Sequence, residues 1–272
     1  MAKKKTAYVC NDCGSEHAKW QGQCTDCGAW NTLQEFVVSS SKTPSRDASY
    51  AGYAGAAGSQ GIQRLADVDL AEVPRISSGM LEFDRVLGGG LVPGSAILIG
   101  GHPGAGKSTL LLQTMCTLAG NMPALYVTGE ESLQQVAMRA KRLGLPTDQL
   151  NMLSETSVER LLNTLQQHKP KIVVIDSIQV MHVEGVESAP GSVSQVRESA
   201  AALTRYAKQT NTVLFLVGHV TKDGTLAGPK VLEHMIDCSI MLEGSGDSRF
   251  RTLRGIKNRF GAINELGVFS ML

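Results

Sequence analysis

Residues 101–108 read Gly-His-Pro-Gly-Ala-Gly-Lys-Ser, which matches the phosphate-binding pattern GxxxxGK[ST]. The apolar run Ala96–Gly100 precedes this stretch, and a helical pattern begins at Ser108. A strand, a glycine-rich turn and a helix in this order let backbone amides and the positive end of a helix dipole converge on phosphate groups. The alternative, a glycine-rich helix entry without a ligand, does not require this context. The pattern therefore predicts a site for ATP.

Within this stretch the side chains have separable roles. We expect Lys107 to reach the terminal phosphates, Ser108 to ligate Mg²⁺ and Thr109 to contact the α-phosphate. The predicted nucleotide-binding residues are Gly101, His102, Pro103, Gly104, Ala105, Gly106, Lys107, Ser108 and Thr109.

Four continuous apolar runs alternate with helical patterns. Runs of this kind are typical of strands buried on both faces of a parallel sheet. The alternation predicts an α/β fold with a doubly wound core. Beyond Asp237, shorter runs between glycine-rich turns predict an antiparallel extension of the sheet. The predicted core strands are Ala96–Gly100, Ala124–Thr128, Lys171–Asp176 and Val213–Gly218, and those of the extension are Ser239–Leu242, Phe250–Lys257 and Glu265–Phe269.

Polar residues follow three of the core strands. Asp176 ends the run from Lys171, and an acid there can hold Mg²⁺ through water. Glu130 and Glu131 follow the strand after the phosphate-binding helix, so a carboxylate there is a candidate to polarise the attacking water. We favour Glu130, since Glu131 precedes Ser132 and could instead cap the next helix. His219 ends the fourth strand, where it is either a sensor of the γ-phosphate or a purely structural histidine.

Residues 249–260 carry five basic side chains and no acidic one. Such a run is usually a solvated face. Here Lys257 and Arg259 are expected to lie in a glycine-bounded turn, which could reach a neighbouring subunit's nucleotide or a nucleic-acid backbone. Together with Lys107, Glu130, Asp176 and His219, these two residues complete the set of candidate catalytic residues.

Four of the six cysteines form two CxxC pairs, Cys10/Cys13 and Cys24/Cys27. Two such pairs are typical of a closed, structural Zn²⁺ site, whereas a redox motif needs only one pair. His17 lies between the pairs and is a less favoured fourth ligand. The two tryptophans, Trp20 and Trp30, flank the second pair. We expect them to form the core of this small module, with base stacking as the alternative. Cys116 and Cys238 are expected to be buried thiols.

Composition divides the chain. Residues 39–61 contain fifteen Gly, Ser or Ala among 23 residues, which predicts a flexible linker. The predicted domains are therefore a zinc module over 1–38, the linker over 39–61 and a nucleotide-binding domain over 62–272. The chain has 26 basic and 25 acidic side chains, so its net charge indicates no particular partner. No apolar run approaches a membrane span and the start has no secretory pattern, so we expect a cytoplasmic protein with no membrane partner.

Two further stretches resemble a known family. Residues 88–95, Gly-Gly-Gly-Leu-Val-Pro-Gly-Ser, resemble the RecA-like and circadian-clock ATPases. The four-cysteine head, Glu130-Glu131 and above all residues 257–261, Lys-Asn-Arg-Phe-Gly, are similar to the bacterial RadA (Sms) family of DNA repair proteins. The resemblance covers essentially the whole chain. One departure is that the family continues into a Lon-protease-like domain, whereas this sequence ends at Leu272.

This resemblance implies a RecA-like ATPase core that acts as a hexameric, ATP-driven motor on single-stranded DNA, together with the RecA recombinase, in recombination intermediates. It also implies that Lys257 and Arg259 couple ATP to DNA at subunit contacts. Two other functions stay open. One is a nucleotide-switched regulatory protein with little turnover, and the other is a small-molecule kinase.

Overall fold

The computed structural model describes residues 5–10, 16–17, 19–38, 64, 74–219, 231–244 and 248–271. Two predictions therefore fall outside the described residues. They are the linker over 39–61 and the position of Cys13. The glycine-rich segment after His219, whose Lys222 and Lys230 are candidates to contact a substrate, also lies outside them. Of the helices that the structure describes, none combines the length and the apolar character that a membrane crossing requires.

The N-terminal module is a three-stranded antiparallel sheet of order β2-β1-β3. Its strands are β1 (Lys5–Cys10), β2 (Glu16–His17) and β3 (Leu33–Val38). Its core holds Cys10, Cys24 and Leu33, with Tyr8 packed against them. The expectation that both tryptophans supply this core was wrong, because Trp20 is 58% exposed and Trp30 is 69% exposed.

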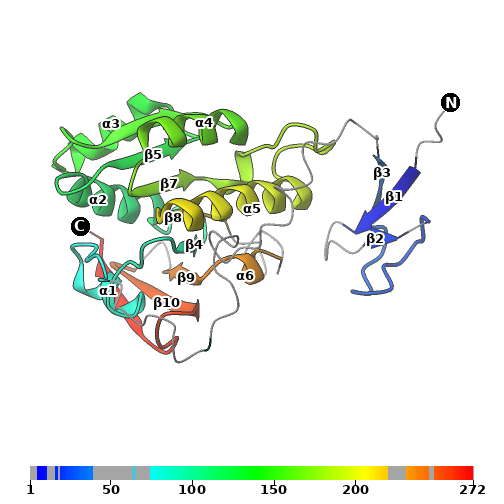
Figure 1. The fold of residues 1–272 in the computed structure, drawn as a ribbon. Coiled ribbons are helices and arrows are strands. Elements are labelled where there is room, and N and C mark those ends of the chain that lie inside the picture. Colours follow the sequence, from blue (N-terminus) through cyan, green and yellow to red (C-terminus); the bar gives the residue numbers. More distant parts are fainter. Residues whose placement is uncertain are drawn as a thin grey trace.

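The C-terminal domain is built on an eight-stranded sheet of order β11-β10-β9-β4-β8-β7-β5-β6. The six strands from β9 to β6 are parallel to one another, whereas β10 pairs antiparallel with both β9 and β11 (Figure 1). The strands are β4 (Ala96–Gly100), β5 (Ala124–Thr128), β6 (Asn151–Ser154), β7 (Ile172–Asp176), β8 (Val213–Val217), β9 (Cys238–Glu243), β10 (Phe250–Asn258) and β11 (Leu266–Ser270).

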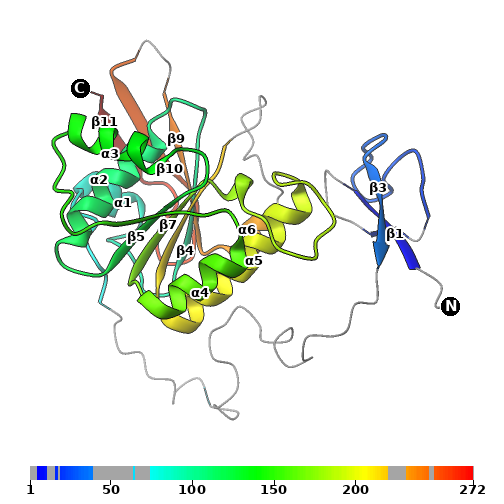
Figure 2. The same ribbon diagram turned by 90° about the horizontal axis from the view of Figure 1, so that it is seen from above.

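Helices cover both faces of this sheet, as Figure 2 shows. A core on one face joins the strands to α1, α2 and α3, and a second core joins the other face to α4, α5 and α6. The doubly wound core is therefore confirmed. The helices are α1 (Leu81–Val86), α2 (Lys107–Ala119), α3 (Leu133–Arg142), α4 (Val158–His168), α5 (Val193–Thr210) and α6 (Val231–Met235), with a 3₁₀ turn over Ile178–Val180.

Two predictions about the sheet need correction. First, β9 pairs in parallel with β4, so the antiparallel extension begins only at β10. Second, the predicted glycine-bounded turn does not include Lys257, which lies in β10, whereas Arg259 follows the strand. The ladder with β9 continues to Asn258 opposite Cys238, and this pairing keeps the backbone at Lys257 extended.

The buried cysteines agree with expectation. Cys116 is 3% exposed and Cys238 is 2% exposed. Burial raises the pKa of Cys116, and burial, with the charge of Asp237 adding to it, raises the pKa of Cys238 to about 12. Both side chains therefore act as small apolar residues in the core.

Candidate nucleotide site, zinc site and basic cluster

The phosphate-binding turn follows β4 and leads directly into α2. Gly106 is the N-cap of α2 and has φ 103°, a left-handed conformation that glycine adopts without steric cost. No side chain caps this end of α2. Its first backbone amides are therefore available to an anion, which is what a phosphate site at a helix N-terminus requires.

Lys107 is the buried cation of this turn, with 4% of its surface exposed. Its Nζ donates hydrogen bonds to the carbonyl oxygens of Gly101 at 2.7 Å and His102 at 3.0 Å. Burial lowers the pKa of Lys107, while the charges of Asp176 and Glu130 act in the opposite direction. The ammonium group is thus folded back onto the turn that would hold the phosphates, near two carboxylates.

The two neighbouring glutamates have different partners. Glu130 accepts a hydrogen bond from the Ser177 hydroxyl, and its Oε1 lies 3.3 Å from Nε2 of His219. Glu131 instead forms an ion pair with Arg139. The cap of α3 is made by Ser132 and Gln135, which form a reciprocal capping box, so the alternative role of Glu131 as that cap is not what the structure shows. Of the two carboxylates, only that of Glu130 has described contacts with residues that follow other strands, namely Ser177 after β7 and His219 after β8.

Asp176 ends β7 and accepts a hydrogen bond from the Tyr126 hydroxyl at 2.5 Å. Burial and the nearby Asp176 raise the pKa of Tyr126 well above its usual value, so the phenol stays a donor. Asp176 and Ser108 line the same pocket. A carboxylate and a hydroxyl oxygen are hard donors that suit Mg²⁺, so these residues fit the predicted ion.

The strand ends enclose one pocket of about 370 Å³. It contains most of the predicted nucleotide-binding and catalytic residues but neither Lys257 nor Arg259. Sequence reasoning missed Arg139 and Arg142, although their spacing of three places both on one side of a helix that follows the two glutamates. The residues that line the pocket are Pro103, Gly104, Gly106, Lys107, Ser108, Thr109, Thr128, Glu130, Glu131, Arg139, Arg142, Asp176, His219 and Met271.

In the N-terminal module, the sulfur atoms of Cys10, Cys24 and Cys27 lie within 4.8 Å of one another. Three convergent thiols with Cys13 as the expected fourth fit a tetrahedral Zn²⁺ site. His17 is closer to this cluster than expected. Its Nε2 lies 3.5 Å from the Cys24 sulfur and 3.8 Å from a carboxylate oxygen of Asp26. His17 therefore stays a possible ligand beside the four cysteines.

We expect one zinc ion per chain in freshly purified, reduced protein. Thiolate ligation excludes water and has no open position, so the metal is structural. Metal analysis together with release by a thiol-specific mercurial would measure it, and Cys27→Ser should lower the zinc content while Cys116→Ser should not. Metal-free wild-type protein would rule out this site.

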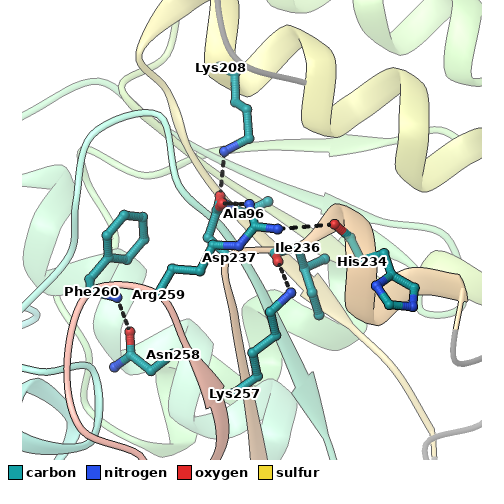
Figure 3. Close-up of polar contacts among 9 residues, drawn as sticks. All are labelled: Ala96, Lys208, His234, Ile236, Asp237, Lys257, Asn258, Arg259 and Phe260. Carbon is teal, nitrogen blue, oxygen red and sulfur yellow. Dashed lines mark hydrogen bonds and ion pairs between the residues drawn. The ribbon is translucent and has the colours of Figure 1, made fainter. Parts of the chain in front are cut away.

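The basic residues Lys257 and Arg259 do not line the pocket. Figure 3 shows their polar contacts. Lys257 donates to the carbonyl oxygen of Ile236 at 2.8 Å, and Arg259 lies 3.2 Å from the carboxylate of Asp237. Asn258 pairs with Cys238 at the start of β9, whose neighbour β4 ends at the phosphate-binding turn. The basic cluster is therefore at the amino ends of these parallel strands, opposite the edge that carries the nucleotide pocket.

Comparison with protein families agrees with this architecture. Residues 81–225 match the family model described as AAA domain. The chain belongs to the AAA domain family. Residues 8–35 match the model described as rubredoxin metal binding domain. Together with the geometry of both sites, these matches confirm the predicted fold class and the expected ATP, Mg²⁺ and Zn²⁺.

This AAA domain chain is also similar over its full length to curated proteins named DNA repair protein RadA. Identity is 68% to the protein of Haemophilus influenzae, 65% to that of Escherichia coli and 46% to that of Bacillus subtilis. In each case the alignment covers 100% of this chain and 59% of the relative. The family resemblance seen in the sequence is thereby confirmed, and the chain spans about three fifths of the length of these relatives.

Proposed function

We propose that the chain is the ATP-hydrolysing part of a DNA repair motor that binds single-stranded DNA and drives branch migration or unwinding of recombination intermediates. The main support for ATP hydrolysis is the pocket that Lys107, Glu130 and Asp176 line together, next to the N-terminus of α2, which no side chain caps. The name of the relatives, DNA repair protein RadA, supports the DNA substrate. We also retain the domain limits 1–38, 39–61 and 62–272 as part of this proposal.

Five residues that line the pocket have separate parts in turnover. The amides at the start of α2 and the Lys107 ammonium bind the phosphates. Ser108 and Asp176, the latter through water, would hold Mg²⁺, which would supply charge neutralisation. Glu130, oriented by Ser177, accepts a proton from the attacking water. His219, 3.3 Å from Glu130, reports the presence of the γ-phosphate to the segment that follows β8.

Lys257 and Arg259 do not line the pocket of their own chain, because they lie at the amino ends of β4 and β9 whereas the pocket is at the carboxyl ends of the parallel strands. We therefore assign them to the nucleotide of a neighbouring copy, where a guanidinium that approaches from outside stabilises the transferring phosphoryl group. This assignment requires a homo-oligomer, for which we propose a hexamer. We further propose RecA recombinase as a partner and the bacterial cytoplasm as the location.

We expect ATP turnover to rise when single-stranded oligo(dT) is added, and Arg259→Ala to abolish that rise while ATP binding is kept. The decisive measurement mixes two variants. The Lys107→Ala variant lacks a working pocket but still presents Arg259 to a neighbouring copy. The Arg259→Ala variant has an intact pocket but presents no guanidinium to its neighbour. If Arg259 acts on a neighbour, the mixture turns over ATP faster than either variant alone.

Solution mass measured on the same samples gives the number of subunits. Turnover of the mixture equal to the mean of its two components would exclude action in trans. Wild-type protein that binds ATP without turnover would favour a nucleotide-switched regulatory protein. Transfer of phosphate to a small acceptor would favour a kinase.

A further inference from the structure

Asp237 is a buried carboxylate outside the nucleotide pocket. Its side chain is 3% exposed, and it lies between α6 and β9 (Figure 3). Its partners come from three separate parts of the chain: the backbone N–H of Ala96 at the start of β4, Lys208 on α5, and Arg259 after β10. A buried carboxylate with several charged partners is a structural ion-pair network unless one partner has another function.

The two oxygens of this carboxylate are not used equally. Oδ2 accepts two hydrogen bonds, from Lys208 at 2.7 Å and from the Ala96 N–H at 3.0 Å. Within the described parts of the chain, Oδ1 accepts from Nη1 of Arg259 alone, at the longer distance of 3.2 Å. Lys208 is 16% exposed, whereas Arg259 is 49% exposed. Lys208 is thus the close, enclosed partner, and Arg259 is the looser, accessible one.

The second contact of the Arg259 guanidinium is also long. Its Nη2 lies 3.3 Å from the carbonyl oxygen of His234, near the C-terminal end of α6. The two contacts do not form the short parallel pair that arginine makes with a carboxylate at its strongest. The guanidinium is therefore held in place without being locked.

We propose that Asp237 and Lys208 are positioning residues for Arg259. Asp237 holds the guanidinium when Arg259 contacts no neighbouring copy. Lys208 limits the strength of the Asp237–Arg259 ion pair, so that Arg259 can leave Asp237 for a phosphate oxygen on a neighbouring copy. This inference rests on the trans role of Arg259 proposed above. When Arg259 leaves, Asp237 keeps its bonds to Lys208 and Ala96, and the buried charge stays compensated. Without Lys208, Arg259 would be the one remaining cation among the described ion-pair partners of this buried carboxylate. Its departure would then leave the charge of Asp237 poorly compensated, which is strongly unfavourable.

The first test is Lys208→Met, which keeps most of the length of the unbranched side chain and removes its charge. Asp237 retains Arg259 and the Ala96 N–H, so the variant is expected to fold. We expect DNA-stimulated kcat to fall by about tenfold, the size of a typical coupling between members of one ion-pair network. ATP binding and the KM for ATP stay unchanged because Lys208 is outside the pocket. Lys171→Met, an exposed lysine at the start of β7, is the matched control and should behave as wild type.

The second test is rescue. Asp237→Asn retains an oxygen that can accept from Ala96 but has no charge to trap Arg259. Adding Asp237→Asn to Lys208→Met should therefore restore kcat to the level of Asp237→Asn alone, which we expect to lie within about threefold of wild type. A merely structural role of Lys208 gives the opposite result, since two lesions in one network would then lower stability and kcat further. Thermal unfolding of all variants measures that stability.

The outcomes separate this inference from the proposed function. If Arg259→Ala keeps full DNA-stimulated turnover, the trans role itself fails. If Arg259→Ala loses stimulation but Lys208→Met retains it, only the positioning role is overturned. The same holds if Lys208→Met loses stimulation and Asp237→Asn does not restore it.

Discussion

Replacing Lys107 by alanine is expected to lower ATP turnover by about a hundredfold to a thousandfold, the usual cost of removing one donor from a charged transition state. Lys107 is the buried cation of the phosphate-binding turn and faces both Asp176 and Glu130. Without it, negative charge on the phosphates would lie near two carboxylates with less compensation. Phosphate release at saturating ATP is the measurement.

The control for this prediction is folding. Lys107 also bonds to the carbonyl oxygens of Gly101 and His102, so its loss could disturb the turn itself. Thermal unfolding separates the two effects, since a collapsed turn would lower the melting temperature as well. Turnover within about threefold of wild type in a well-folded Lys107→Ala protein would remove the central assignment of the pocket.

Glu130→Gln should reduce hydrolysis by about a hundredfold to ten-thousandfold, the range that general base catalysis contributes, while ATP still binds. Glutamine keeps the size of the side chain and can still accept the hydrogen bond from Ser177, but it cannot take up a proton. A fluorescent ATP analogue measures binding, and phosphate release measures turnover.

Glu131→Gln is the matched control because the same change is made one residue away. Its carboxylate is paired with Arg139 on α3, so we expect a loss much smaller than that of Glu130→Gln. If Glu131→Gln shows the large loss of turnover and Glu130→Gln does not, Glu131 is the base and the contacts of Glu130 with Ser177 and His219 are structural. If both keep wild-type turnover, neither carboxylate activates the water.

The parallel core could be predicted from the sequence because its strands are buried on both faces. Ala96–Gly100 and Ala124–Thr128 have the predicted bounds, and every residue in them is buried. By contrast, β6 (Asn151–Ser154) went unpredicted. It is four residues long, lies at the edge of the sheet and is only partly buried, so it has no continuous apolar run. Edge strands of this kind are formed by pairing with a neighbour, which a single sequence does not show.

The candidate site was predictable where chemistry is local and not where it depends on distant segments. The strand-end residues Glu130, Asp176 and His219 were found because parallel strands bring their carboxyl ends together. The partners of Arg259 were not found, since Asp237 and Lys208 are 22 and 51 positions away and neither belongs to a motif. The prediction that the tryptophans form the core of the N-terminal module was wrong for another reason. Among the residues whose burial the structure describes, the core of this module is formed by Cys10, Cys24 and Leu33 with Tyr8 packed against them, and both tryptophans lie at the surface.

One short strand has a special place in this arrangement. At its first residue, Ala96, β4 donates a backbone hydrogen bond to Asp237, and beyond its last residue, Gly100, the chain enters the predicted phosphate-binding turn. Five extended residues span about 16 Å, and a rod bonded on both sides neither stretches nor buckles. A displacement of one end of β4 along its axis must therefore displace the other end or break the hydrogen bonds of β4 with β8 and β9. The ion-pair network around Asp237 and the phosphate-binding turn therefore lie at the two ends of one rigid strand, and a displacement of one is transmitted to the other along β4.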